Sequence, residues 1–148
     1  MKKRRLAIVT IALALIVGVC SWMYLGNRTA IPENCIELVY ENKTSYVDLD
    51  KLDLKEVTGE TINGKGEVNT IHSNGIELKD VLENHKITSY ENVTVEADDA
   101  YSAVVGKEEI DEKEKVYVLV EEEKASLVVF GDPNSKRNVR NVIRITAE

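Results

Sequence analysis

The pattern of apolar and polar positions divides the chain into an unbroken apolar stretch near the N-terminus and a longer part in which the two alternate. Residues 6–25 contain no charged side chain. A helix rises about 1.5 Å per residue, so this stretch would be about 30 Å long, the thickness of the hydrocarbon core of a bilayer. It therefore predicts one transmembrane helix.

The flanks of this stretch indicate its orientation. Residues 2–5 are all basic and stand immediately before it, and Trp22 and Tyr24 lie near its far end. Basic residues stay on the cytoplasmic side, and amphipathic rings favour the interface. We therefore expect a single-pass protein of the cell membrane with its C-terminal domain outside the cytoplasm. The expected segments are a cytoplasmic basic segment, a transmembrane anchor, a linker and an extracytoplasmic domain, at residues 1–5, 6–25, 26–34 and 35–148.

Two alternatives to an uncleaved anchor stay open. The apolar region of a cleaved signal peptide usually covers about 7–15 residues, and no A-x-A-like cleavage site follows this one. A lipoprotein signal at Cys20 would place the bulky Val19 before the cysteine. All three interpretations place the domain outside the cytoplasm.

Beyond residue 34, short segments rich in β-branched and aromatic residues predict strands. The sequence Asn63-Gly64 separates two of them and predicts a hairpin, because Asn-Gly tolerates the positive φ that tight hairpin turns need. The predicted strands are residues 35–40, 55–62, 67–72, 93–97, 102–105, 115–120, 126–130 and 139–146.

Helical periodicity is confined to a short segment. Apolar residues recur at helical spacing from Leu78 and predict a helix over residues 77–85, with Asn74 as its N-terminal cap. A short helical turn is expected at residues 50–54. The predicted class is α+β, with a mixed, mostly antiparallel sheet and few short helices, preceded by one transmembrane helix.

Composition agrees with a globular domain, and charge excludes one class of partner. The chain is 43% hydrophobic and 30% charged, with a net charge of −7. Without the four basic residues at 2–5, 15 Lys and Arg stand against 26 Asp and Glu, a net charge of about −11. Nonspecific nucleic-acid binding depends on neutralising phosphates, so no nucleic-acid partner is expected.

The sequence offers no complete catalytic or metal-binding pattern. His72 and His85 are the only histidines, and neither stands in a nucleophile motif. Cys20 and Cys35 do not have the spacing of a zinc site. The Asp98-Asp99 pair is interpreted as a turn, since nothing near it supplies a calcium loop. We therefore assign neither a catalytic residue nor a metal ligand.

The best candidate site is a basic cluster in this acidic domain. Lys136, Arg137, Arg140 and Arg144 follow the turn-rich residues 131–135. Two guanidiniums can hold a phosphate or carboxylate bidentately, which predicts an anion site. The alternative is a solvated edge strand, which resists unwanted pairing.

Regular strand alternation would place Arg140, Val142 and Arg144 on one face. Arg137 lies three positions before Arg140 and would point to the other face. We expect a bulge or the preceding turn to bring Arg137 and Arg140 together, with Lys136 and Tyr101 at the rim of the site. Val142 would share the face of the arginines in this arrangement.

Three blocks in this order resemble the molybdopterin-binding domain of the sulfite oxidase family. They are residues 74–82 (NGIELKDVL), 93–102 (VTVEADDAYS) and 135–145 (SKRNVRNVIRI). The resemblance spans about residues 47–147 and implies the fold of that domain and an oxidoreductase-like ancestry. It also implies anion contact by Arg137 and Arg140, because the closing segment helps to hold the phosphate of the cofactor in that family.

The chain departs from the family at the metal. Family enzymes place a cysteine thiolate on molybdenum upstream of the first block, whereas residues 60–69 contain no cysteine and Cys35 lies too far toward the anchor. A soft thiolate is hard to replace. Molybdopterin is therefore a cofactor by resemblance only, and we expect a domain that binds an anionic ligand or a redox partner protein without molybdenum catalysis. The alternative is a non-catalytic cell-surface binding or assembly module with no cofactor.

Overall fold

The computed structural model describes residues 10, 13–21 and 31–148. The chain divides into two units, residues 1–30 and 31–148. In the first unit, residues 13–21 are helical. The rest of the predicted anchor, apart from residue 10, lies outside the described residues, as do residues 1–5 and 26–30. In the described part of the chain, no helix is long and apolar enough to cross a membrane.

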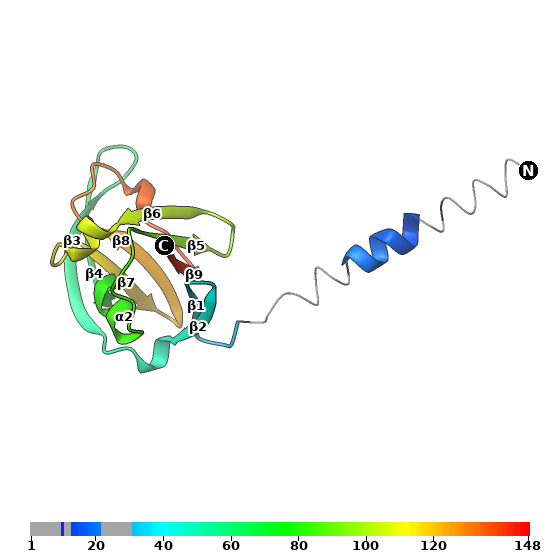
Figure 1. Ribbon diagram of the computed structural model, residues 1–148. Coiled ribbons are helices and arrows are strands. Elements are labelled where there is room, and N and C mark those ends of the chain that lie inside the picture. Colours follow the sequence, from blue (N-terminus) through cyan, green and yellow to red (C-terminus); the bar gives the residue numbers. More distant parts are fainter. Residues whose placement is uncertain (1–9, 11–12, 22–30) are drawn as a thin grey trace, which may run out of the picture. The chain divides into compact units, whose positions relative to one another are not determined.

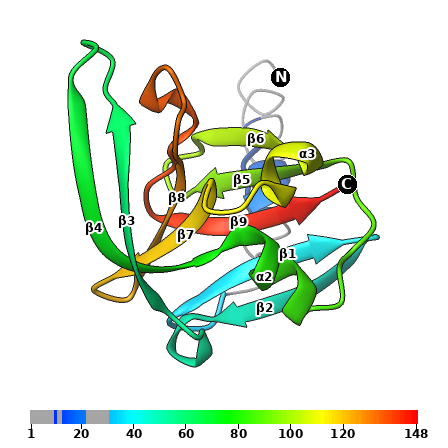
Figure 2. The ribbon, with the colours of Figure 1, turned by 90° about the vertical axis from the view of Figure 1, so that its left-hand side faces the viewer.

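Residues 31–148 form two β-sheets (Figures 1 and 2). One has five strands in the order β2-β1-β9-β5-β6, and the other has four in the order β3-β4-β7-β8. Strand β1 pairs in parallel with β9, and the other pairings are antiparallel. The strands are β1 (Cys35–Tyr40), β2 (Lys43–Asp48), β3 (Lys55–Ile62), β4 (Val68–Glu77), β5 (Asn92–Ala97), β6 (Ser102–Gly106), β7 (Val116–Glu121), β8 (Lys124–Val129) and β9 (Val142–Ala147).

The helices within residues 31–148 are short. They are α2 (Leu78–Asn84), α3 (Lys107–Asp111) and the 3-10 turns η1 (Leu49–Lys51) and η2 (Ser135–Arg137). This confirms the α+β class with mixed and antiparallel sheets. Helix α2 and the turn near residue 50 were expected. Helix α3 was not, because its acidic sequence resembles a solvated loop.

The eight predicted strands are present, β1 and β3 with the predicted ends and the other six with shifted ends, and one strand was missed. Strand β2 is a polar edge strand, joined to β1 through Glu41 and Asn42, whose φ angles are 49° and 61°. A turn with two positive φ angles usually contains glycine. Its absence here, together with the polar sequence of β2, hid the hairpin.

Two local predictions were wrong in detail. The β3–β4 hairpin exists, but its positive φ is at Gly66 (81°), and Asn63 Oδ1 instead accepts hydrogen bonds from Lys65 N (2.9 Å) and Glu67 N (3.0 Å). Asn74 does not cap α2, because it lies in β4 opposite Glu56. The second error arises because β4 continues to Glu77, farther than its polar sequence suggests.

The predicted regular alternation of the last strand is also wrong. Ala97 lies opposite Val142 and Glu96 opposite Arg144, so the pairing shifts by one residue at Ile143. Val142 and Ile145 are consequently both buried in the core. The shift leaves Arg144 outside the core, beside Glu96. This is the re-aiming of side chains that a β-bulge produces.

The core has a large and a small part. The large part draws side chains from both sheets, and its bulkiest fully buried members include Leu38, Leu78, Leu127 and Ile145. The small part contains Val57, Leu119 and Val128, with Ile71, Tyr117 and Phe130 packed against it. Because neighbouring strand residues point to opposite faces, Leu127 and Val128 of β8 belong to different parts. The β3–β4 hairpin thus covers the face of β7 and β8 that lies opposite the main core.

Candidate ligand cleft

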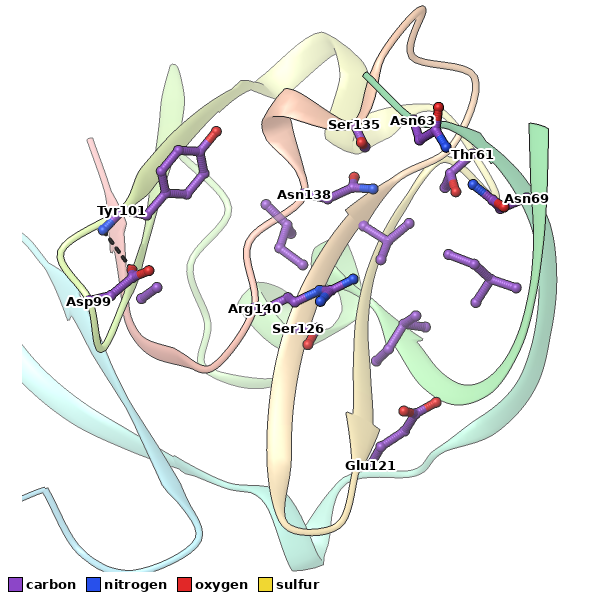
Figure 3. Close-up of a pocket in the computed structure, with 15 residues that line it drawn as sticks. Thr61, Asn63, Asn69, Asp99, Tyr101, Glu121, Ser126, Ser135, Asn138 and Arg140 are labelled. Carbon is purple, nitrogen blue, oxygen red and sulfur yellow. Dashed lines mark hydrogen bonds between the residues drawn. The ribbon is translucent and has the colours of Figure 1, made fainter. Parts of the chain in front are cut away.

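A cleft of about 820 Å³ lies between the β3–β4 hairpin, here called the arm, and the strands β7 and β8. Figure 3 shows Thr61, Asn63 and Asn69 on one side of it, Asp99 and Tyr101 on the opposite side, and Arg140 between them. The lining residues are Thr61, Asn63, Asn69, Ile71, Ala97, Asp99, Tyr101, Leu119, Glu121, Ser126, Leu127, Val128, Ser135, Asn138 and Arg140.

Two glycines set how closely the arm approaches β7 and β8. A Cβ atom at Gly75 would lie 2.7 Å from Leu119 Cδ2 and 2.9 Å from the carbonyl oxygen of Val118. A Cβ atom at Gly59 would lie 2.4 Å from Cε1 of the Phe130 ring. Glycine permits both close approaches because it has no side chain. The cleft is the part of the gap under the arm that side chains leave open.

The floor of the cleft is apolar and its rim is polar. Ile71, Leu119 and Val128 line the floor and belong to the small core. The rings of Tyr117 and Phe130 pack against the same small core, with centroids 5.7 Å apart. Hydroxyl, amide and carboxylate side chains line the rest. Small-molecule sites typically combine such an apolar lining with a few placed polar groups, in about 300–1,000 Å³.

Arg140 is the cation of this cleft. It also lines a second cleft of about 860 Å³, together with Glu121 and Ser126, which the two clefts share. Its side chain makes no hydrogen bond or ion pair with any residue that the structure describes. A guanidinium has five N–H donors, so those of Arg140 are left to solvent or to a ligand.

Arg137 is placed differently. Its Nη1 and Nη2 donate to the two carboxylate oxygens of Glu109 at 2.6 and 2.8 Å, and its Nε donates to Asp132 Oδ2 at 2.7 Å. Nη2 also donates to Asp132 Oδ1. The Arg137 hydrogen bonds lower the pKa of Glu109, and those carboxylates raise the pKa of Arg137. Arg137 thus ties the loop after β8 to α3, and it does not line the cleft.

Arg144 is likewise neutralised within the domain. Its Nε donates to Glu37 Oε2 at 2.7 Å, and its Nη1 donates to Glu96 Oε2 at 3.1 Å. These partners lie on β1 and β5, the two strands that flank β9. The hydrogen bond to Glu37 is the main cause of a raised Arg144 pKa. Arg144 therefore links three strands of the five-stranded sheet.

Tyr101 lines the cleft, whereas Lys136 does not: its side chain is exposed and only its backbone contacts Tyr101. The Tyr101 hydroxyl donates to the backbone carbonyl oxygen of Lys136, and Tyr101 N donates to Asp99 Oδ1 at 3.0 Å. Ala100, which stands between Asp99 and Tyr101 in the chain, has a φ of 67°. This backbone conformation is energetically unfavourable for a residue other than glycine. Of the four predicted site residues, Arg140 and Tyr101 line the cleft, and Lys136 contacts Tyr101 through its backbone.

The loop that carries Arg140 is fixed by side-chain amides. Asn134 Oδ1 accepts a hydrogen bond from Lys136 N at 3.1 Å, and Asn138 Oδ1 accepts one from Val129 N at 3.0 Å. The Leu127 and Val139 backbones also exchange hydrogen bonds, at 2.7 and 3.0 Å. Arg140 is therefore held at a defined place beside β8.

His85 and Cys35 line neither of the two clefts that contain Arg140, and His72 lines only the second one. His85 Nδ1 lies 2.9 Å from the carbonyl oxygen of Val81, one turn earlier, and His72 Nδ1 lies 3.0 Å from Thr58 Oγ1. Cys35 begins β1 and lines a separate small cleft. Within residues 10, 13–21 and 31–148, no three His, Cys, Asp or Glu residues gather as metal ligands.

Sequence reasoning missed most of the polar lining. Asn69 lies in the arm, Glu121 and Ser126 lie in β7 and β8, and Asn138 lies in the loop before β9, so only the fold brings all four to one cleft. No local spacing among them signals a site. Comparison with known proteins adds no further residues, because no family model matches the sequence and the search of curated proteins found no match.

Proposed function

We propose that residues 31–148 form a ligand-binding domain whose cleft takes a small anionic molecule, with Arg140 as the anchoring cation. The observation that carries this proposal is the contrast among three arginines. Arg137 and Arg144 are each held by two carboxylates, whereas Arg140 lines the cleft without a partner among the described residues. A guanidinium at the rim of an apolar-floored cleft suits a phosphate or carboxylate.

The resemblance to molybdopterin-binding domains supports a phosphorylated, ring-containing ligand. Arg140, Ser135 and Asn138 offer N–H and O–H donors that fit a phosphate, and the apolar floor fits a ring. The lining contains no cysteine, so it supplies no thiolate to a metal. We therefore propose binding of an anionic ligand on a scaffold of this kind, without molybdenum catalysis by this chain.

The location is part of the proposal. We propose that residues 6–25 anchor the domain at the outer side of the cell membrane, on the charge step at residues 2–5 and the length of the apolar stretch. A reporter fused after Glu148 should be active outside the cytoplasm, and the chain should resist carbonate extraction. A soluble product that begins between residues 21 and 31 would show that residues 6–25 belong to a cleaved signal peptide and not to an anchor.

Thermal melts of the full chain in a mild detergent test the ligand site. The probes are inorganic phosphate and a phosphorylated pterin. A ligand that binds only the folded state stabilises it by RT ln(1 + [L]/Kd), about 2.7 kcal/mol at a hundredfold excess over Kd. We expect this stabilisation in the wild type and in Lys136→Gln, which removes the same charge from an exposed side chain, and its loss in Arg140→Gln. The absence of a shift in the wild type would refute the proposal.

A second candidate is a binding or assembly module with no small-molecule cofactor. One observation favours it: β4 has a backbone edge that no strand of residues 31–148 covers.

A further inference from the structure

Strand β4 is paired along most of its length on one side and over only three residues on the other. It pairs with β3 from Val68 to Gly75, but with β7 only from Gly75 to Glu77. Toward β7, no strand in residues 31–148 pairs with Val68–Asn74. Figure 2 shows the arm extending beyond the other strands of its sheet. The sheet therefore forks at Gly75, and one side of the fork is an unpaired backbone edge of seven residues.

The second cleft lies in this fork. It is lined by His72, Ser73 and Asn74 of β4 and by Val120 and Glu121 of β7. Successive side chains of a strand point to opposite faces. A cleft that touches three successive residues of β4 therefore borders the edge of the strand, where backbone N–H and C=O groups point.

The edge contains unsatisfied polar groups. In an antiparallel strand that is paired on one side only, alternate residues direct their N–H and C=O groups to the open side. The Ser73 hydroxyl oxygen is also shielded from solvent and has no hydrogen-bond partner among the described residues. Buried polar groups normally have partners, so this position favours a ligand that supplies them.

The edge also lacks the usual protection against pairing. Exposed edges commonly carry charged residues, especially lysine, or proline. The outer edge strand of this sheet, β3, carries Lys55, Glu56 and Glu60. The segment Val68–Asn74 carries no Lys, Arg, Asp, Glu or Pro, and Val68 at its start is 58% exposed.

We infer that the fork binds an extended peptide segment of a partner protein, which pairs with β4 over Val68–Asn74 and places a carboxylate on Arg140. Arg140 lines both clefts, so one strand in the fork reaches it. Apolar side chains on one face of that strand would meet Ile71 and Leu119 on the floor. Backbone pairing gives affinity in such strand addition, and the pockets for alternate side chains give specificity. The inference rests on the proposed anion site for its carboxylate, while the strand pairing stands on the geometry of β4.

A displayed library of random octapeptides with free C-termini, selected on the full chain in detergent, supplies the probe. The selected peptide is then synthesised with a single N-methyl group at each position in turn. Strand pairing uses every second N–H of the peptide, so we expect binding to weaken about tenfold or more at alternate positions and little at those between. In hydrogen exchange, the bound peptide should protect amides within Val68–Asn74.

Three results would overturn the inference: no enriched peptide, N-methyl effects without a period of two, or protection elsewhere than β4. Self-association of the chain that the peptide cannot displace would assign the edge to a second copy instead. Arg140→Gln should weaken the peptide about tenfold while leaving the N-methyl pattern unchanged, and Lys136→Gln should do neither. If the peptide binds Arg140→Gln as tightly as the wild type, the carboxylate contact is rejected and the strand pairing is retained. A phosphate-dependent stabilisation without peptide binding would retain the anion site and reject the strand.

Discussion

In the five-stranded sheet all neighbouring strands are paired over most of their length, whereas in the four-stranded sheet the two central strands, β4 and β7, soon separate. In the first, each pair of neighbouring strands is in register over at least four residues, and Arg144 joins β1, β9 and β5. In the second, β4 and β7 share only three residue pairs before they separate. All five strands of the first sheet bury side chains in the large core, and the second sheet also contributes to it. Only the second sheet separates, and both clefts lie beside it.

The largest effect is expected where β4 and β7 are joined. In Gly75→Ala the new Cβ atom would meet the carbonyl oxygen of Val118, which cannot move without disturbing the pairing of β4 with β7. Such overpacking costs about 3 kcal/mol, measured as the loss of unfolding free energy in urea. Gly64→Ala is the control, because nothing lies within 4 Å of its Cβ position. Equal stability of the two variants would show that the arm is not fixed at Gly75.

Adjacent valines of β8 compare the two parts of the core. Val129 faces the large core and Val128 the small one. Val129→Ala should cost about 2 kcal/mol, because two buried methyl groups are lost and the surroundings cannot collapse. Val128→Ala should cost about 1 kcal/mol, since the arm above it can settle into the space. A larger loss for Val128→Ala would mean that the arm is as firmly packed as the main core.

Sequence patterns predicted what local rules determine. The strands, α2 and the arm's hairpin follow from alternation, helical spacing and turn residues. A bulge was one of two features expected to reorient Arg137. The bulge at Ile143 instead determines the position of Arg144. The bulge depends on how β9 pairs with β5, and the sequence of residues 139–146 alone gives no information about that pairing. A sequence seldom shows such a tertiary effect.

Of the residues that line the candidate site, the sequence predicted the cation Arg140 and Tyr101. The basic cluster drew attention to Arg137 and Arg140 together, because both stand out in an acidic domain. What separates them is the pair of carboxylates, Glu109 and Asp132, that the fold brings to Arg137. Glu109 lies in α3, a helix that the sequence did not reveal. Arg140 is distinguished by the lack of such partners among the described residues.

Acid should weaken the contact between α3 and the loop after β8. The Arg137 guanidinium holds the pKa of Glu109 below its unfolded value of about 4.3. A depressed folded pKa contributes stability that is present above the unfolded value and is lost as the pH falls through the folded one. Glu109→Gln should therefore lose about 1 kcal/mol at pH 7, and its difference from the wild type should shrink below about pH 4. Urea melts across that range measure this, and a difference that stays constant with pH would exclude the linkage.

The smallest effect on stability is expected at Arg140, the residue proposed to bind the ligand. Arg144→Gln leaves Glu37, whose side chain is only 12% exposed, without its cation, and should cost about 1 kcal/mol. Arg140→Gln breaks no hydrogen bond or ion pair with any described residue, so unfolding free energy should change by less than about 0.5 kcal/mol. Lys136→Gln, which makes the same change in net charge at an exposed position, is the control for nonspecific charge effects. Urea melts without added anions give all three values. If Arg140→Gln lowers the unfolding free energy as much as Arg144→Gln does, Arg140 stabilises the fold. Its guanidinium would then not be free to bind a ligand.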